Sequence, residues 1–79
     1  MSIAVEQSKS TVHSIRFRKD LWTTTKARQW LHSHDFKPIK KVDVGLNYYR
    51  YRIIEPNLFK SFITKKYDNG INIVIGYYK

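Results

Sequence analysis

The sequence contains no cysteine, and this absence excludes disulfide bonds and zinc sites built on thiolates. The three glycines are isolated at positions 45, 70 and 76, which excludes a glycine-rich phosphate loop. No apolar run approaches the roughly 20 residues of a membrane helix, and residues 1–10 lack the basic start and apolar stretch of a signal peptide. We therefore expect a protein that is neither exported nor membrane-spanning.

Acidic residues are also scarce, since six Asp and Glu stand against fifteen Lys and Arg and the formal net charge is +9. A charge of this density attracts polyanions, namely nucleic acid, anionic lipid or an acidic protein.

The 79 residues suffice for one domain, because a chain of this size buries about 60% of the surface that its unfolded form exposes. We expect residues 1–10 to form a flexible polar tail, in which Ile3 and Val5 could add an edge strand, and residues 11–79 to form a single domain.

Alternation of apolar and polar residues predicts two half-buried strands that each present arginines on one face. In residues 11–19 the apolar face consists of His13, Ile15 and Phe17, and the polar face of Ser14, Arg16 and Arg18. The segment 38–54 reads as two strands joined around Gly45. In its second strand the apolar face consists of Tyr49, Tyr51 and Ile53, and the polar face of Tyr48, Arg50 and Arg52.

One main helix is predicted over residues 23–35, because Thr23 is a suitable N-cap and Trp22 could pack on Ala27 as a hydrophobic staple. Its apolar stripe is formed by Ala27, Trp30, Leu31 and, at the edge, His34. The helix should end near His34 or Asp35, since Pro38 forces its predecessor into an extended conformation.

The C-terminal segment predicts a hairpin with one of two loops. A two-residue loop at Asn69-Gly70 would place charged residues opposite the isoleucine face of the last strand. A three-residue loop over residues 68–70, with Gly70 left-handed, would instead pair Tyr67 with Ile71 and Ile63 with Ile75, and we favour it. Before the hairpin, Pro56 and the spacing of Leu58, Phe59, Phe62 and Ile63 allow a short second helix near residues 56–62.

These elements predict an α+β domain, with the main helix packed on an antiparallel sheet of four or five strands. A split βαββαβ arrangement of ferredoxin type is the nearest alternative topology. The helix would cover one face of the sheet and leave the other uncovered.

Four segments show a resemblance to a known domain: "HSIRF", "LWTTTKARQWLHSHDFKP", "YYRYRIIEPNLFKSF" and "GINIVIGYY". The chain resembles a small domain of uncharacterised proteins of large DNA viruses and tailed bacteriophages, which stands alone or is attached to virion or morphogenesis proteins. The resemblance covers residues 12–78 and is most specific in the block W-T-x-x-x-A-x-x-W-L-x-x-H-x-F-K-P, residues 22–38. It implies a viral or phage origin, with the protein inside the host cell, in cytoplasm or nucleus, or in the virion, and it implies no catalytic residue.

Interleaved basic and aromatic residues provide the main candidate site. Guanidinium groups bind phosphates through two parallel hydrogen bonds, and tyrosine rings offer stacking surfaces for unpaired bases. If the two arginine-bearing strands are neighbours, their outward faces form one patch. The candidate nucleic-acid-binding residues are Arg16, Arg18, Tyr48, Arg50 and Arg52, with a rim of Lys40, Lys41, Lys65 and Lys66.

Other kinds of site receive less support. His32 and His34 are two residues apart, so on a helix they point about 200° apart and cannot share a metal; no metal or cofactor is expected. A metal-independent ribonuclease or toxin could be built from His13, His32, Lys41 and Arg50, but no catalytic spacing supports it. A recognition helix that presents Lys26, Arg28, Gln29 and His32 to the major groove would have few base contacts.

We therefore expect a non-catalytic viral or phage module that binds DNA or RNA, mainly through phosphate contacts and with low sequence specificity. The alternative is a virion structural or assembly-associated protein whose basic face binds an acidic protein partner. Three tyrosines expected to be exposed, Tyr48, Tyr77 and Tyr78, favour that alternative. A small ribonuclease or toxin is the third possibility. The sequence leaves the oligomeric state open.

Overall fold

The computed structural model describes residues 9–79, and residues 1–8 lie outside the described part of the chain. The expected flexible tail and edge strand at Ile3 and Val5 fall almost entirely on those residues, although the first strand already begins at Ser10. In chain order the elements are β1 (Ser10–Arg18), α2 (Thr24–Ser33), β2 (Asp43–Val44), β3 (Tyr48–Arg52), the 3-10 turn η1 (Pro56–Leu58), β4 (Phe59–Lys66) and β5 (Ile71–Tyr78).

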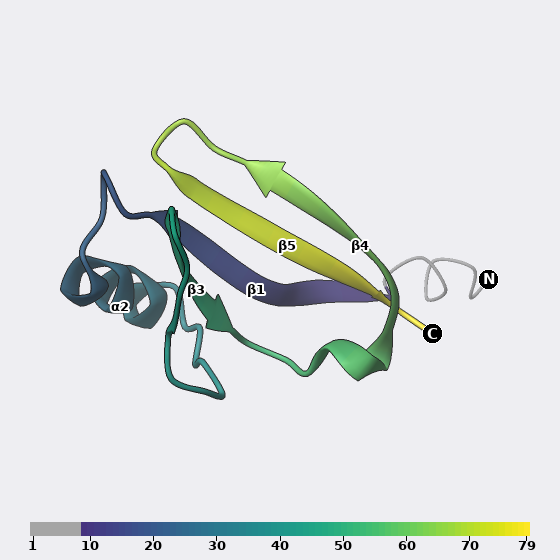
Figure 1. Ribbon diagram of the computed structural model, residues 1–79. Coiled ribbons are helices and arrows are strands. Elements are labelled where there is room, and N and C mark those ends of the chain that lie inside the picture. Colours follow the sequence, from purple (N-terminus) through teal and green to yellow (C-terminus); the bar gives the residue numbers. More distant parts are fainter. Residues whose placement is uncertain (1–8) are drawn as a thin grey trace.

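The strands form one five-stranded sheet in the order β2-β3-β1-β5-β4, and every neighbouring pair is antiparallel. The single α-helix of residues 9–79 packs against it (Figure 1). The prediction of an α+β domain with one main helix and an antiparallel sheet is therefore confirmed. The ferredoxin-like alternative is not adopted, because its second helix is replaced here by the short turn η1.

The sheet has two distinct faces, because successive side chains of each strand point to opposite sides. The face toward α2 bears the core: Ile15, Phe17, Ala27, Leu31, Tyr51 and Ile71 form one buried cluster. Half-buried apolar residues surround that cluster, among them Trp22, Trp30, Phe36 and Val42. Phe17 lies at its centre, with edge-on contacts to the rings of Trp22, Trp30 and Tyr51 at centroid distances of 5.0, 5.7 and 5.7 Å.

Both ends of α2 are fixed by local hydrogen bonds. At its start the Thr23 hydroxyl accepts a hydrogen bond from the Lys26 amide at 3.1 Å, as expected for an N-cap. At its end the Phe36 amide donates to Leu31 O and the Asp35 amide to His32 O, the two bonds of a Schellman motif. Asp35 adopts the left-handed conformation that this motif requires, with φ at 61°. The helix therefore ends at Ser33, before the constraint that Pro38 imposes.

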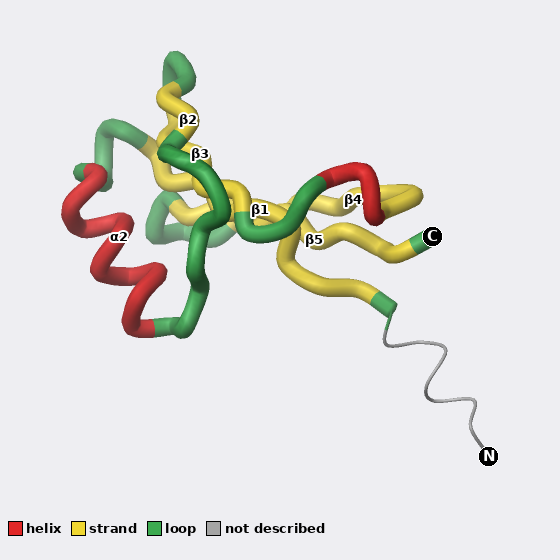
Figure 2. Tube along the Cα trace, turned by 90° about the horizontal axis from the view of Figure 1, so that it is seen from below, coloured by secondary structure: helices red, strands yellow, loops and turns green. Residues whose placement is uncertain are grey.

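α2 lies at one end of the sheet rather than across its whole width. Figure 2 shows the helix to one side of the strands and well separated from β4. The residues that follow it run back along β3, where the Ile39 amide donates to Arg52 O at 2.9 Å. α2, the one α-helix in the described part of the chain, is too short and too polar to cross a lipid bilayer.

The C-terminal hairpin has the predicted three-residue loop. Ile63 pairs with Ile75, and the Tyr67 amide donates to Ile71 O at 2.9 Å. Gly70 has a φ of 87°, a conformation that glycine adopts without steric cost. The loop is held to the start of the helix, because Trp22 Nε1–H donates to Asn69 O at 2.8 Å.

The predicted second helix near residues 56–62 is reduced to one turn. η1 ends at Leu58, and Phe59 already begins β4. The helix-like spacing of apolar residues in this segment has another cause, since Phe59 is buried against the backbone of Gly76 on β5. Strand pairing with β5 overrides the local pattern.

Two histidines lie elsewhere than predicted. A bulge between Val12 and Ser14 interrupts the alternation of β1, so His13 leaves the face of Ile15 and Phe17. Its ring instead contacts Phe62, which pairs with Gly76 on the opposite face. His34 was expected at the edge of the core but is an exposed C-cap residue stacked on Trp30, with ring centroids 3.9 Å apart.

Candidate nucleic-acid interface

Arginines from two neighbouring strands gather on the sheet face that α2 does not cover. β1 and β3 are adjacent, and their register places Arg16 directly opposite Arg50, Arg18 opposite Tyr48 and Ser14 opposite Arg52. The five predicted residues therefore occupy one continuous surface. We call this surface the arginine face; it consists of Arg16, Arg18, Tyr48, Arg50 and Arg52.

One row of side chains crosses the arginine face from edge to edge of the sheet. Arg16 and Arg50 occupy its centre and pair with each other. On its other side Arg16 pairs with Asn72, and on its other side Arg50 pairs with Asp43. In strand order β4-β5-β1-β3-β2 the row runs Lys66, Asn72, Arg16, Arg50, Asp43. Three cations and one carboxylate therefore share a single cross-strand line.

Arg16 is the most buried cation of this row. Its side chain is half-buried, its guanidinium carbon lies 5.4 Å from the centre of the Tyr48 ring, and its Nε has no hydrogen-bond partner among residues 9–79. Like charges directly opposite each other on neighbouring strands are destabilising, and so is a buried N–H without an acceptor. Arg16 is thus held in a position that costs stability.

The other three arginines each lie near one carboxylate. Arg50 Nη2 is 3.1 Å from Asp43 Oδ2, Arg52 Nη1 is 3.8 Å from Glu55 Oε1, and Arg18 pairs with Asp20. Most of these side chains are solvent-exposed, although that of Arg52 is only 25% exposed, and exposed ion pairs contribute about 0–1 kcal/mol. Phosphate oxygens can therefore replace these carboxylates at little cost in stability.

The predicted lysine rim is partly brought to the arginine face. Lys40 and Lys41 line a small cavity of about 190 Å³ together with Asp43, Arg50 and Arg52. Lys66 belongs to the cross-strand row, through its pairing with Asn72. Lys65 pairs with Ile73 and so emerges on the face that α2 covers, which removes it from the candidate site.

Aromatic side chains occupy the other end of this sheet face. The rings of Phe59 and Phe62 contact His13 at centroid distances of 5.8 and 5.1 Å, and Tyr78 lies 4.9 Å from Phe59. His13 is 8% exposed, and neither of its ring nitrogens has a hydrogen-bond partner in the described part of the chain. Burial lowers the pKa of His13, and the nearby charges of Arg52 and Arg50 lower it further.

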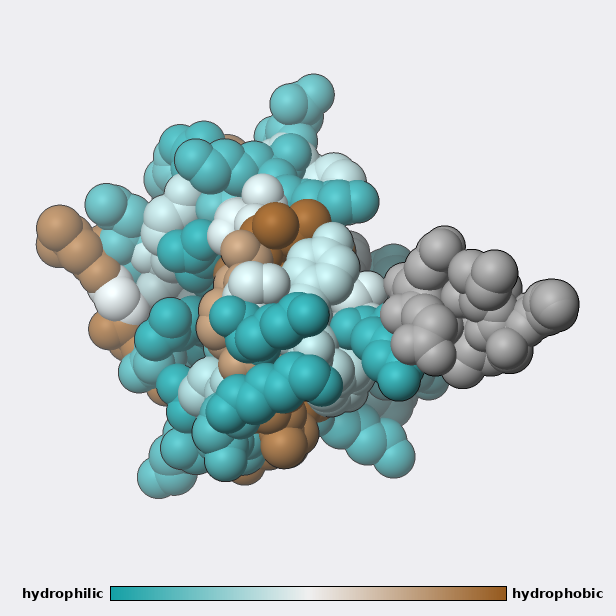
Figure 3. Space-filling view, turned by 90° about the vertical axis from the view of Figure 1, so that its right-hand side faces the viewer, coloured by the Kyte–Doolittle hydropathy of each residue, from teal (hydrophilic) through white to brown (hydrophobic). Residues whose placement is uncertain are grey.

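The tyrosines that were expected to be exposed are all half-buried, namely Tyr48, Tyr77 and Tyr78. The exposed apolar residues near the arginine face are instead Val44 and Leu46, with exposed fractions of 62% and 89%. Both lie in the β2–β3 hairpin and share a cavity lining with Arg16, Tyr48 and Arg50. Figure 3 shows, on another side of the molecule, that apolar side chains occur as separate groups among hydrophilic ones.

Sequence reasoning missed two members of the cross-strand row. Asn72 is 4% exposed and separates Lys66 from Arg16, but nothing in "INIVIGYY" distinguishes it from a solvated strand residue. Asp43 pairs with Arg50 across a strand of only two residues, too short to give a periodic signal. Its position opposite an arginine follows only from the register.

The histidines proposed for a ribonuclease are not brought together. His13 packs on the rings of the uncovered sheet face, whereas His32 is exposed on α2, which lies against the other face. A site that uses both residues is incompatible with this arrangement. Within residues 9–79 no three His, Asp or Glu side chains are grouped in a way that could hold a metal ion.

Comparisons with models of protein families, with curated proteins and with solved structures find no match to this chain. The class of protein is therefore defined by the fold alone: a small α+β domain with one helix on a five-stranded antiparallel sheet. The resemblance to domains of DNA viruses and phages stays a prediction.

Proposed function

We propose that the protein is a non-catalytic module that binds nucleic acid through the arginine face. Its contacts are mainly to phosphates, so the binding has low sequence specificity. The viral or phage setting belongs to this proposal as its expected context.

The observation that supports this proposal is the juxtaposition of Arg16 and Arg50. Arg16 and Arg50 occupy opposite positions on one face of β1 and β3 and line the same cavity, and Arg16 is half-buried with an Nε–H that lacks an acceptor among the described residues. A phosphate between them would supply acceptors for both groups and remove their repulsion. Tyr48, whose ring lies under Arg16, offers a surface on which an unpaired base can stack.

The test is the salt dependence of binding to a mixed-sequence duplex and to a single strand of the same length. If about five phosphates are contacted, log affinity falls against log salt with a slope near −4.5 for the duplex and near −3.5 for the single strand. A slope near zero contradicts the proposal.

A pair of double variants distinguishes the arginine face from the helix. Arg50→Ala with Arg52→Ala should weaken binding to all sequences alike and reduce the duplex slope by about 1.8, because two phosphate contacts are lost. The matched control is Lys26→Ala with Arg28→Ala on α2, which removes the same charge from the other side of the domain. If the control pair weakens binding more than the arginine pair, the helix rather than the arginine face is the interface.

An acidic protein is the second candidate partner, favoured by the exposure of Val44 and Leu46 beside the arginines. Protein interfaces combine buried apolar residues with arginine and tyrosine, whereas phosphate binding needs no exposed leucine. Replacing Leu46 by Ser should leave nucleic-acid binding unchanged within a factor of two. A large loss of binding to virion proteins in that variant, with DNA binding retained, would favour the second candidate.

A further inference from the structure

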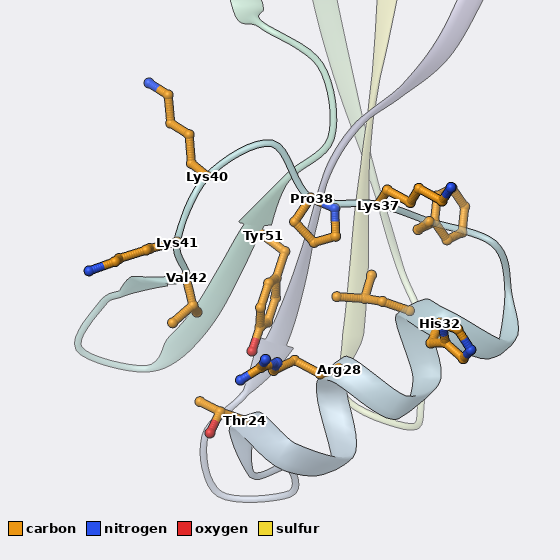
Figure 4. Close-up of a pocket in the computed structure, with 11 residues that line it drawn as sticks. Thr24, Arg28, His32, Lys37, Pro38, Lys40, Lys41, Val42 and Tyr51 are labelled. Carbon is orange, nitrogen blue, oxygen red and sulfur yellow. The ribbon is translucent and has the colours of Figure 1, made fainter.

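A cavity of about 640 Å³ opens between α2 and the segment that follows it, and the arginine face does not include it. Its size falls within the range of roughly 300–1,000 Å³ that is typical of small-molecule sites. In Figure 4 the helix and the loop 36–42 enclose this space, and Tyr51 of β3 points into it toward α2.

The cavity combines an apolar floor with a cationic border. Leu31, Phe36 and Val42 supply the apolar contacts. The border contains Arg28, His32, Lys37, Lys40 and Lys41, and none of the 11 lining residues is acidic. This border differs from the arginine face, where three of the four arginines have a carboxylate partner.

A buried polar group marks the inner end of the cavity. Tyr51 is 3% exposed, and its hydroxyl has no hydrogen-bond partner among the residues that the structure describes. Burial raises the pKa of Tyr51, while the charge of Arg28 acts in the opposite direction. The hydroxyl is consequently protonated at neutral pH and can donate a hydrogen bond.

Arg28 completes the polar end of the site. Its guanidinium group extends from α2 toward the Tyr51 hydroxyl (Figure 4), and among the described residues it forms no ion pair. Lys40 and Lys41 point outward from the loop, so they raise the local potential without closing the cavity (Figure 4). An anionic oxygen placed between Tyr51 and Arg28 would accept hydrogen bonds from both.

We propose that this cavity binds a small organic anion with a flat apolar body. The body lies against Leu31, Phe36 and Val42, and the anionic group accepts hydrogen bonds from the Tyr51 hydroxyl and the Arg28 guanidinium. Such a ligand satisfies the buried hydroxyl and neutralises part of the cationic border at the same time. The proposal does not rest on nucleic-acid binding, because Tyr51, Arg28 and the apolar floor are not part of the arginine face; only Lys40 and Lys41 border both sites.

The probe is 1-naphthyl phosphate, titrated at constant ionic strength into the full chain while the methyl signals of Leu31 and Val42 are followed by NMR. Saturable shifts at both residues are expected. Inorganic phosphate lacks the apolar body and 1-naphthalenemethanol lacks the charge, so each should bind at least tenfold more weakly than the probe.

Two variants test the polar end. Tyr51→Phe keeps the ring that packs on Phe17 and removes the hydroxyl alone, so the variant should fold. We expect it to weaken probe binding about tenfold, as does Arg28→Gln, because each removes a hydrogen bond to a charged group. Arg50→Gln on the arginine face is the control and should change the affinity less than twofold.

The proposal is overturned by any one of the following results. These are the absence of saturable shifts at Leu31 and Val42, wild-type affinity in both Tyr51→Phe and Arg28→Gln, and equal binding of the neutral alcohol. Shifts confined to the backbone amide signals of Arg16 and Tyr48, followed in the same titration, would assign the probe to the arginine face and likewise overturn the proposal.

Discussion

Arg16 on β1 and Arg50 on β3 occupy directly opposite positions in an antiparallel pair, with like charges on the same face of the sheet. Opposed like charges lower stability, and the buried Nε–H of Arg16 adds to this cost because it has no acceptor within residues 9–79. Such an arrangement is expected at a binding site, where strain in the unbound protein is relieved by the ligand.

The first prediction is that Arg16→Met stabilises the domain and weakens nucleic-acid binding. The substitution removes the opposed charge and the unpartnered N–H, and the loss of the contact with Tyr48 offsets only part of this gain. We expect the free energy of unfolding to rise by about 1 kcal/mol in urea titrations, while affinity for DNA falls.

Arg18→Met is the control, because Arg18 is exposed and pairs with Asp20. Its free energy of unfolding should stay within about 0.5 kcal/mol of the wild type. A loss of stability in Arg16→Met would show that Arg16 contributes to the fold rather than to binding.

The second prediction uses two adjacent lysines that face opposite sides of the sheet. Lys66 lies in the row with Arg16, whereas Lys65 pairs with Ile73 on the other face. Lys66→Ala should reduce the slope of log affinity against log salt by about 0.9, the value for one phosphate contact. Lys65→Ala, which removes the same charge, should leave the slope unchanged; equal effects of the two variants would place the interface elsewhere.

The third prediction concerns pH. The pKa of His13 is lowered in the folded protein, so the unfolded chain binds a proton more readily than the folded one. The free energy of unfolding should therefore be highest above the ordinary histidine pKa of about 6.5 and should fall as the pH decreases below that value. Urea titrations at pH values between about 7.5 and about 5, on either side of that pKa, measure this decrease in the free energy of unfolding.

His13→Phe should remove this part of the pH dependence, since phenylalanine can pack on Phe59 and Phe62 without a titrating group. His32→Gln, on the exposed side of α2, is the matched control and should keep the wild-type profile. The free energy of unfolding could still decrease in both variants as the pH falls through the ordinary histidine pKa of about 6.5. In that case a group other than His13 causes the decrease.

The fourth prediction compares two glycines. A Cβ at position 76 would lie 2.5 Å from the Phe59 ring, whereas one at position 45 would meet only Tyr48 O at 3.4 Å. Gly76→Ala should displace Phe59 and lower the free energy of unfolding by about 1–3 kcal/mol. Gly45→Ala should change it by less than about 1 kcal/mol. Thermal unfolding followed by circular dichroism distinguishes the two.

The sequence predicted the fold class, the faces of β3 and of β1 from Ser14 onward, and the register of the last hairpin, because these follow from a period of two and from the geometry of one short loop. The alternation around Tyr51 was sufficient to predict that Arg50 and Arg52 point away from the core. Arg16 lies beside Arg50 and Arg52 only if β1 and β3 are neighbours, and the structure shows that they are.

Other features could not be predicted because they depend on contacts between distant segments. The bulge at Val12–Ser14 leaves no mark in a regularly alternating sequence, so His13 was assigned to the wrong face. The helix-like spacing of Phe59 and Phe62 reflects packing against Gly76 and His13 rather than a helix. The cavity above Tyr51 arises between α2 and a loop, and no local pattern encodes it.

Because α2 lies at one end of the sheet, the backbone amides of different strands are protected from hydrogen exchange to different degrees. Residues of β1, α2, β3 and β5 form the buried core cluster, and β4 contributes none. β4 is also an edge strand whose side chains beyond Phe59 are exposed. Its amides should therefore exchange with solvent through local opening, while those of β1 exchange only on global unfolding. When β4 opens, β5 becomes the edge of the sheet and can pair with a strand of another chain.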